Sequence, residues 1–142
     1  MHSNDKGVLF VVTGAHWTWA ATEAARSVAE SNPWLNIGIF TDQENVDPLF
    51  HFIGRIHAGE SRRKHEYVGR SPFAETLYLD SDVRVAGDLK DMFRLLERHD
   101  MAGAQVRYRS SPRRLGKYQL DIPQAFPQIN CGVLLYRKCP AV

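Results

Sequence analysis

The chain has 142 residues, of which 44% are hydrophobic and 24% are charged. This is the mixture of an ordinary globular protein, and residues 1–142 supply enough chain for a single domain with a hydrophobic core. The formal net charge of +2 is too small to indicate a nucleic-acid partner.

The first half of the chain alternates between strand and helix patterns. The apolar run within residues 7–14 predicts a strand that ends in a glycine turn. That run is too short for a transmembrane segment and has no signal-peptide cleavage pattern, so we expect neither. The alanine-rich segment 19–31 has helical spacing of its apolar residues. Residues 35–42 predict a second strand, and residues 51–57 predict a weaker third strand.

The second half continues the alternation. In chain order, the sequence predicts a short helix, a strand, a longer helix and two further strands at residues 62–69, 75–80, 87–99, 100–106 and 130–138. The longer helix begins with Asp88 as its expected N-cap and carries apolar side chains on one face. Strands that alternate with helices predict an α/β fold with a mostly parallel sheet, covered on both faces.

The strand predicted at 75–80 leads into Asp-Ser-Asp. In open α/β sheets, ligands bind at the carboxyl ends of the strands. Carboxylates at positions i and i+2 around a tight turn can face one cation, so Asp80 and Asp82 are candidate ligands for Mg²⁺ or Mn²⁺. The alternative is a polar turn that these aspartates merely shape, before the next helix begins.

A phosphatase site is another alternative for the same triplet. Phosphatases of the haloacid dehalogenase class also carry Asp-x-Asp after a hydrophobic strand, the first as nucleophile and the second as acid and base. Here Val83 is followed by Arg84, which departs from that motif. The triplet also follows the fourth predicted strand, whereas that class places it on the first.

The order and spacing of four blocks between about Gly7 and Lys138 resemble the amino-terminal part of a GT-A fold glycosyltransferase, closest to the family-eight type and its bacterial relatives. The blocks are VVTGAHWTWAATEAARSVAESNP, IGIFTD, RRKHEYVGRSPFAETLYLDSDVRVAGDLKDMFRLLERHDMAGA and FPQINCGVLLYRK. The resemblance implies a Rossmann-like nucleotide-sugar-binding domain. It also implies transfer of a sugar from a nucleotide-diphosphate donor, usually a UDP-sugar, to a hydroxyl of a glycan, a lipid-linked sugar or a protein.

The resemblance implies roles for individual residues. Asp80 and Asp82 would hold the Mn²⁺ or Mg²⁺ ion that bridges the two donor phosphates, with Asp80 contacting the metal or the ribose. The other positions that match the family's substrate-binding residues are Thr13, Gly14, Ala15, Asp42, Lys64, Asn130 and Gly132. The first four would meet the nucleoside, Lys64 the diphosphate, and the Asn-x-Gly strand the donor sugar or acceptor. An ordinary turn or surface role is the alternative for these positions.

Aromatic residues open the first predicted helix. His16, Trp17 and Trp19 could stack on a base, but aromatic residues at this position more often anchor the core, and we expect core anchors. The other histidines lack metal-ligand spacing and are expected to be structural. The basic segment 107–117, with Arg113 and Arg114, is hypothesised to meet an anionic acceptor.

Two cysteines occur, and their spacing matches no zinc or redox signature. We therefore expect Cys131 and Cys139 to be reduced thiols of a cytoplasmic protein, with Cys131 packed rather than reactive.

The resembling enzymes extend well past the Asn-x-Gly strand, where a late histidine completes the metal shell. This sequence stops at CPAV, so we expect an incomplete domain. Two hypotheses follow: a glycosyltransferase domain that is active when complemented, or an inactive remnant that binds nucleotide or a partner chain through an exposed sheet edge.

Overall fold

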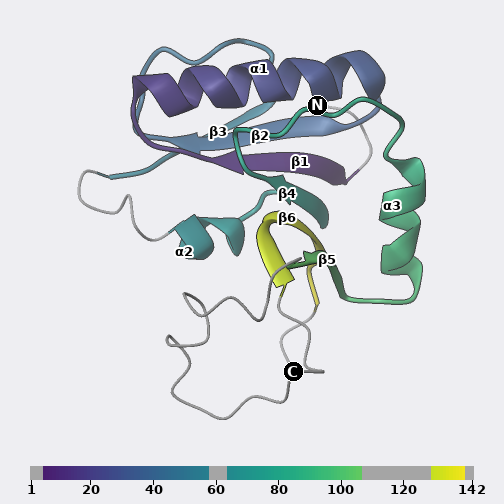
Figure 1. Ribbon diagram of the computed structural model, residues 1–142. Coiled ribbons are helices and arrows are strands. Elements are labelled where there is room, and N and C mark those ends of the chain that lie inside the picture. The colour runs from purple at the N-terminus through teal and green to yellow at the C-terminus, as the bar shows by residue number, and fades with distance from the viewer. Residues whose placement is uncertain (1–4, 58–63, 107–128, 140–142) are drawn as a thin grey trace.

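A computed structural model describes residues 5–57, 64–106 and 129–139 (Figure 1). Six strands form one sheet in the order β3-β2-β1-β4-β6-β5. The strands are β1 (Lys6–Val11), β2 (Asn36–Thr41), β3 (Phe52–Arg55), β4 (Glu75–Leu79), β5 (Met101–Gln105) and β6 (Ile129–Arg137). The helices are α1 (Ala15–Ser31), α2 (Lys64–Val68), α3 (Lys90–Arg94) and the 3₁₀ turn η1 (Leu95–Glu97).

The sheet has a parallel part and an antiparallel part. β3, β2, β1 and β4 run parallel, with Val8 opposite both Ile37 and Leu77. β6 then pairs antiparallel with β4 on one side and with β5 on the other, so that Leu79 lies opposite Val133. The predicted α/β fold with a mostly parallel sheet is therefore confirmed.

The period-two alternation of the strands divides the core between two faces. Val8 and Phe10 point to the face that α1 and α3 cover, where Ala25, Val28 and Phe93 complete the packing. Figure 1 shows α1 lying across this face. The intervening residues of the same strands point to the opposite face.

That opposite face has a smaller cover. Leu9, Val11 and Tyr78 pack there against Tyr67 of α2 and against Ile56. Among the described residues, α2 covers this side only in part, and a cleft opens at the carboxyl ends of β1 and β4. The site described below lies in this cleft.

Two helices differ from their predicted bounds. α1 begins at Ala15 rather than at residue 19, because Gly14 adopts φ +83° and turns the chain directly from the loop into the helix. The helix predicted over 87–99 is α3 followed by η1. Asp88 accepts a hydrogen bond from Lys90 N at 2.9 Å, but the N-cap position is Leu89, so the predicted N-cap was wrong.

None of the helices in the described part of the chain combines the length and the apolar composition needed to cross a bilayer. The basic segment 107–117, with Arg113 and Arg114, lies outside the described residues.

Candidate functional site

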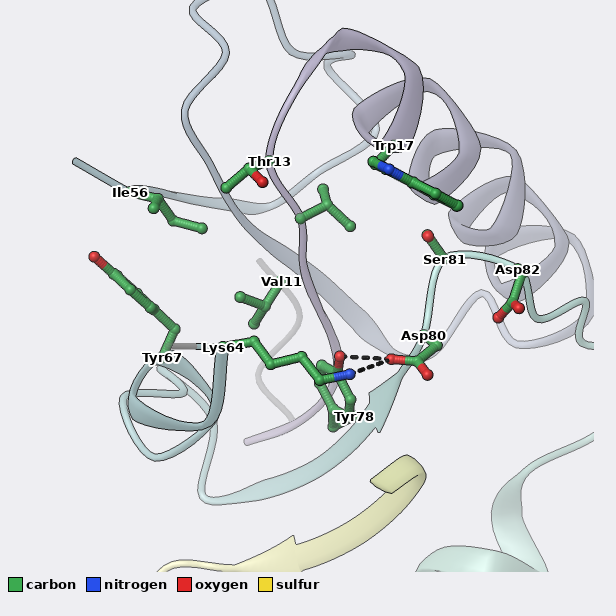
Figure 2. Close-up of a pocket in the computed structure, with 11 residues that line it drawn as sticks. Val11, Thr13, Trp17, Ile56, Lys64, Tyr67, Tyr78, Asp80, Ser81 and Asp82 are labelled. Atoms are coloured by element: carbon green, nitrogen blue, oxygen red, sulfur yellow. Dashed lines mark hydrogen bonds and ion pairs between the residues drawn. The ribbon is translucent and has the colours of Figure 1, made fainter. Parts of the chain in front are cut away.

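A cleft of about 310 Å³ opens at the carboxyl ends of β1 and β4 (Figure 2). Polar side chains enter it from α2, from β4 and from the turn after β4. Thr13, Lys64, Tyr78, Asp80 and Asp82 all line this cleft. The two aspartates therefore lie at the strand end where α/β folds bind ligands, as the sequence predicts.

Asp80 is the most connected of these side chains. Its Oδ1 accepts a hydrogen bond from the Tyr78 hydroxyl at 2.8 Å and forms an ion pair with Lys64 Nζ at 3.1 Å. Figure 2 shows both contacts meeting on one oxygen. The side chains of Lys64 and Asp80 are each 38% exposed, so the pair borders the cleft and remains accessible to a ligand.

Tyr78 is a site residue that the sequence analysis missed. Burial raises the pKa of Tyr78, and its hydrogen bond to Asp80 raises it further, so the phenol stays protonated and donates to the carboxylate. The two-residue period of a β-strand could have revealed this role. Residues 78 and 80 share one face of β4, whereas Leu77 and Leu79 face the core under α1.

Gly132 fits closely against the Asp80 carboxylate. A Cβ atom at Gly132 would lie 2.7 Å from Asp80 Oδ2 and 3.1 Å from Asn130 Oδ1. The Gly132 carbonyl accepts a hydrogen bond from Asp80 N at 2.9 Å, and Gly132 N donates to Asn130 Oδ1 at 2.8 Å. The structure therefore brings the predicted residues Asn130 and Gly132 beside Asp80.

The donor atoms around the turn fit a hard divalent cation. Asp82 is exposed and lines the same cleft as Asp80, so the two side chains provide carboxylate oxygens, the ligands that Mg²⁺ and Mn²⁺ prefer. The absence of a side chain at Gly132 leaves space next to Asp80 Oδ2. Within residues 5–57, 64–106 and 129–139, no group of three or more His, Cys, Asp or Glu side chains gathers as a metal site.

The first turn lies beside the end of β2. Gly14 N donates a hydrogen bond to Asp42 Oδ1 at 2.8 Å, and Gln43 Nε2 donates to the same oxygen at 2.9 Å. The hydrogen bond from Gln43, followed by that from Gly14, lowers the pKa of the Asp42 carboxyl. Thr13 lines the cleft, but Ala15 lines a separate groove and Asp42 holds the turn. The nucleoside contact predicted for these residues stays a prediction.

The prediction that the aromatic residues at the start of the first helix anchor the core was wrong. Trp17 and Trp19 are 52% and 62% exposed, and His16 is exposed as well, so none of the three is a core anchor. Because α1 begins at Ala15, both indoles lie on the solvent side of its first turns, while Thr18 between them is buried. Trp17 instead borders the cleft, across from Tyr67 (Figure 2).

The prediction that Cys131 is packed was also wrong. Cys131 lies near the start of β6 and is exposed. Cys139 is likewise a free, exposed thiol. His51 has a structural role as predicted, since its Nδ1 accepts a hydrogen bond from Ile37 N at 3.0 Å.

A scan against protein-family models and a search of curated proteins found no match. Solved structures do match. The glycosyltransferase GlyE of Streptococcus pneumoniae TIGR4 has 22% identity and a TM-score of 0.61, over 93% of this chain and 33% of GlyE. The galactosyltransferase LgtC, solved with donor and acceptor sugar analogues, has 18% identity and a TM-score of 0.64, over 92% of this chain and 57% of LgtC.

TarS of S. aureus is a third similar structure, with 15% identity and a TM-score of 0.53 over 92% of this chain and 47% of TarS. These likenesses show that the described chain has the GT-A-like fold of glycosyltransferases, as the sequence predicts. The chain spans between a third and three fifths of the length of these proteins.

Proposed function

We propose that this domain binds a nucleotide-diphosphate sugar, with a UDP-sugar as the expected donor, and transfers the sugar to an acceptor hydroxyl. One observation carries the proposal: Asp80, Asp82 and Lys64 line one cleft at the carboxyl end of a central strand, in a glycosyltransferase fold. LgtC, which has this fold, was solved with donor and acceptor sugar analogues.

The proposed chemistry breaks the bond between the sugar's anomeric carbon and the diphosphate, and forms a bond from that carbon to the acceptor oxygen. The bonding electrons leave with the diphosphate, and the proton of the acceptor hydroxyl passes to the solvent. Mn²⁺ or Mg²⁺ held by Asp80 and Asp82 would offset the charge on the departing diphosphate.

The chain's own residues support this chemistry. The Lys64 ammonium lies 3.1 Å from Asp80 Oδ1, and it brings a positive charge to the cleft where a diphosphate would bind. The protonated Tyr78 fixes the orientation of Asp80 through a 2.8 Å hydrogen bond. The exposed indole of Trp17 offers a flat apolar surface for the nucleobase.

Nucleotide binding without turnover is the second candidate function. It is favoured by the site itself, because within the described residues no third His, Cys, Asp or Glu side chain joins Asp80 and Asp82 as a metal-binding group. The phosphatase alternative receives no such support, because the matching structures are glycosyltransferases.

Calorimetric titration with UDP, with and without Mn²⁺, tests the proposal. We expect saturable binding that requires Mn²⁺ and weakens at least about tenfold in Asp80→Asn and in Asp82→Asn, because each substitution removes a charged ligand. Asp91→Asn is the matched control, because its carboxylate is 92% exposed on α3, outside the cleft.

A folded protein that binds no UDP, or that binds equally well in Asp82→Asn, would overturn the proposal. Transfer and binding are then separated by incubating the protein with a UDP-sugar and acceptors. Binding without release of UDP would favour the second candidate.

A further inference from the structure

A second depression lies on the other side of Gly14. It has a volume of about 470 Å³ and runs between the first turns of α1 and the segment after β2, residues 43–47. We call it the α1 groove. Among the described residues, none lines both the groove and the cleft. The two come nearest along the chain at Thr13, which lines the cleft, and Ala15, which lines the groove. The α1 groove is therefore a separate surface feature.

The outer wall of the α1 groove is held in place by several contacts. Arg26 of α1 forms an ion pair with Asp47 at 2.8 Å, and the other Asp47 oxygen accepts a hydrogen bond from Leu49 N at 2.9 Å. Gln43 N donates to Thr41 Oγ1, and Arg55 donates to the Gln43 carbonyl. Because these bonds connect the segment to α1, β2 and β3, the groove is formed before any ligand binds, which lowers the entropic cost of binding.

The charge of the α1 groove argues against a phosphate ligand. Its only guanidinium, that of Arg26, lies 2.8 Å from Asp47 and 3.5 Å from Glu23. The described lining thus carries two carboxylates for one cation, which disfavours an anion. A ligand of the α1 groove is therefore not expected to be an anion.

The remaining lining residues combine an aromatic surface with planar polar groups. Trp19 is 62% exposed at the groove. The exposed Asn45 offers an amide, and Glu23 offers a carboxylate that is 52% exposed. A pyranose ring has an apolar face of C–H bonds and a rim of hydroxyls, which matches an indole face beside amide and carboxylate groups.

We propose that the α1 groove is a saccharide-binding subsite and that it holds the acceptor as a neutral glycan. The acceptor role rests on the proposed function, whereas saccharide binding rests on the groove itself. The His16 ring lies 5.1 Å from Trp17 and 6.3 Å from Trp19, between ring centroids. The three rings are exposed and connect Trp19 in the groove with Trp17, the proposed nucleobase surface, so a saccharide in the groove would lie next to the donor site.

An array of immobilised oligosaccharides, probed with the labelled protein in the absence of nucleotide, tests the proposal. We expect wild type to bind a set of neutral glycans and Trp19→Ala to bind them at least about tenfold more weakly, while Trp19→Phe retains part of the affinity. Leu95→Ala is the matched control, because it also removes an exposed apolar side chain, 46% exposed on η1. Thermal unfolding of each variant checks that the fold is kept.

The outcomes separate this proposal from the proposed function. Glycan binding that Asp82→Asn leaves intact, while the same variant loses UDP, supports a subsite distinct from the cleft. No glycan bound by wild type, or binding lost in Trp17→Ala but kept in Trp19→Ala, would overturn it. If wild type binds glycans through Trp19 but binds no UDP, the acceptor role is wrong and the saccharide subsite stands.

Discussion

The parallel and antiparallel parts of the sheet differ sharply in burial. Within the parallel part, each residue of β2 is buried, and so are the last five of β1 and the last four of β4, while the edge strand β3 has no buried residue. On β6 only Leu135 is buried, and on β5 no residue is. The parallel part therefore contributes most of the buried core residues of the sheet, while the antiparallel strands β6 and β5, which follow β4 in the sheet, contribute Leu135 alone.

The candidate site lies where the two parts meet. Asp80 follows the buried β4, whereas Gly132 and Asn130, which border its carboxylate, belong to the exposed β6. The core therefore depends on β4 and its parallel neighbours, whereas the candidate site also depends on the exposed β6. Substitutions can therefore affect one property and spare the other.

The largest effect is expected in the core of the parallel part. Leu77 on β4 is 1% exposed, and Leu77→Ala should lower the free energy of unfolding by about 2–5 kcal/mol through lost burial and a cavity. Met101 on β5 is 54% exposed, and Met101→Ala should change it by less than about 0.5 kcal/mol. Urea unfolding measures both, and equal losses would show that the two parts are equally important for stability.

An effect on binding with little effect on stability is expected at the junction. In Gly132→Ala the new methyl group would lie only 2.7 Å from Asp80 Oδ2, so the carboxylate would have to move. Mn²⁺-dependent UDP binding should then weaken about tenfold or more, a loss of about 1.4 kcal/mol of binding free energy. Gly87→Ala is the control, since a Cβ there meets nothing within 4 Å. Unchanged calorimetric affinity in Gly132→Ala would mean that β6 does not shape the site.

The smallest effect is expected in the turn beside β2. Because the pKa of Asp42 is lowered in the folded chain, its charged form stabilises the fold above the unfolded pKa of about 3.9, and this stabilisation disappears as pH falls through the folded pKa. Asp42→Asn should therefore lower Tm slightly at pH 7 and leave it unchanged at about pH 2.

Scanning calorimetry at the two pH values, with the exposed neighbour Glu44→Gln as control, measures this difference. A difference between Asp42→Asn and wild type that persists in acid would show that the Asp42 charge is not its source.

The sequence predicted all six strands because their apolar runs and bounding turn residues are local signals. It placed each strand boundary within three residues of the observed one. The start of α1 was missed because it depends on the positive φ of Gly14, which residue patterns do not reveal. The split of the predicted 87–99 helix was missed because its end depends on the chain's turn toward β5, a tertiary constraint.

The candidate site was predicted to a similar degree. The Asp-Ser-Asp turn, Lys64 and the Asn-x-Gly strand were identified, and the structure brings them together. The link from Gly14 to Asp42 was not foreseen, because it joins residues through space rather than along a motif. The role of Tyr78 at Asp80 was overlooked, although the two-residue period of a strand indicates it. Metal and donor binding by these residues stay predictions.

The late position of β6 in the chain has a consequence for how the protein forms. As the chain is synthesised, β1, α1, β2, β3 and β4 all emerge before β6 and can assemble as a parallel unit. The 2.9 Å hydrogen bond from Asp80 N to Gly132 O joins residues 52 positions apart, so it cannot form before residue 132 has emerged. A nascent chain that stalls before β6 can therefore assemble its parallel strands and still lack the Gly132 contact beside the Asp80 carboxylate.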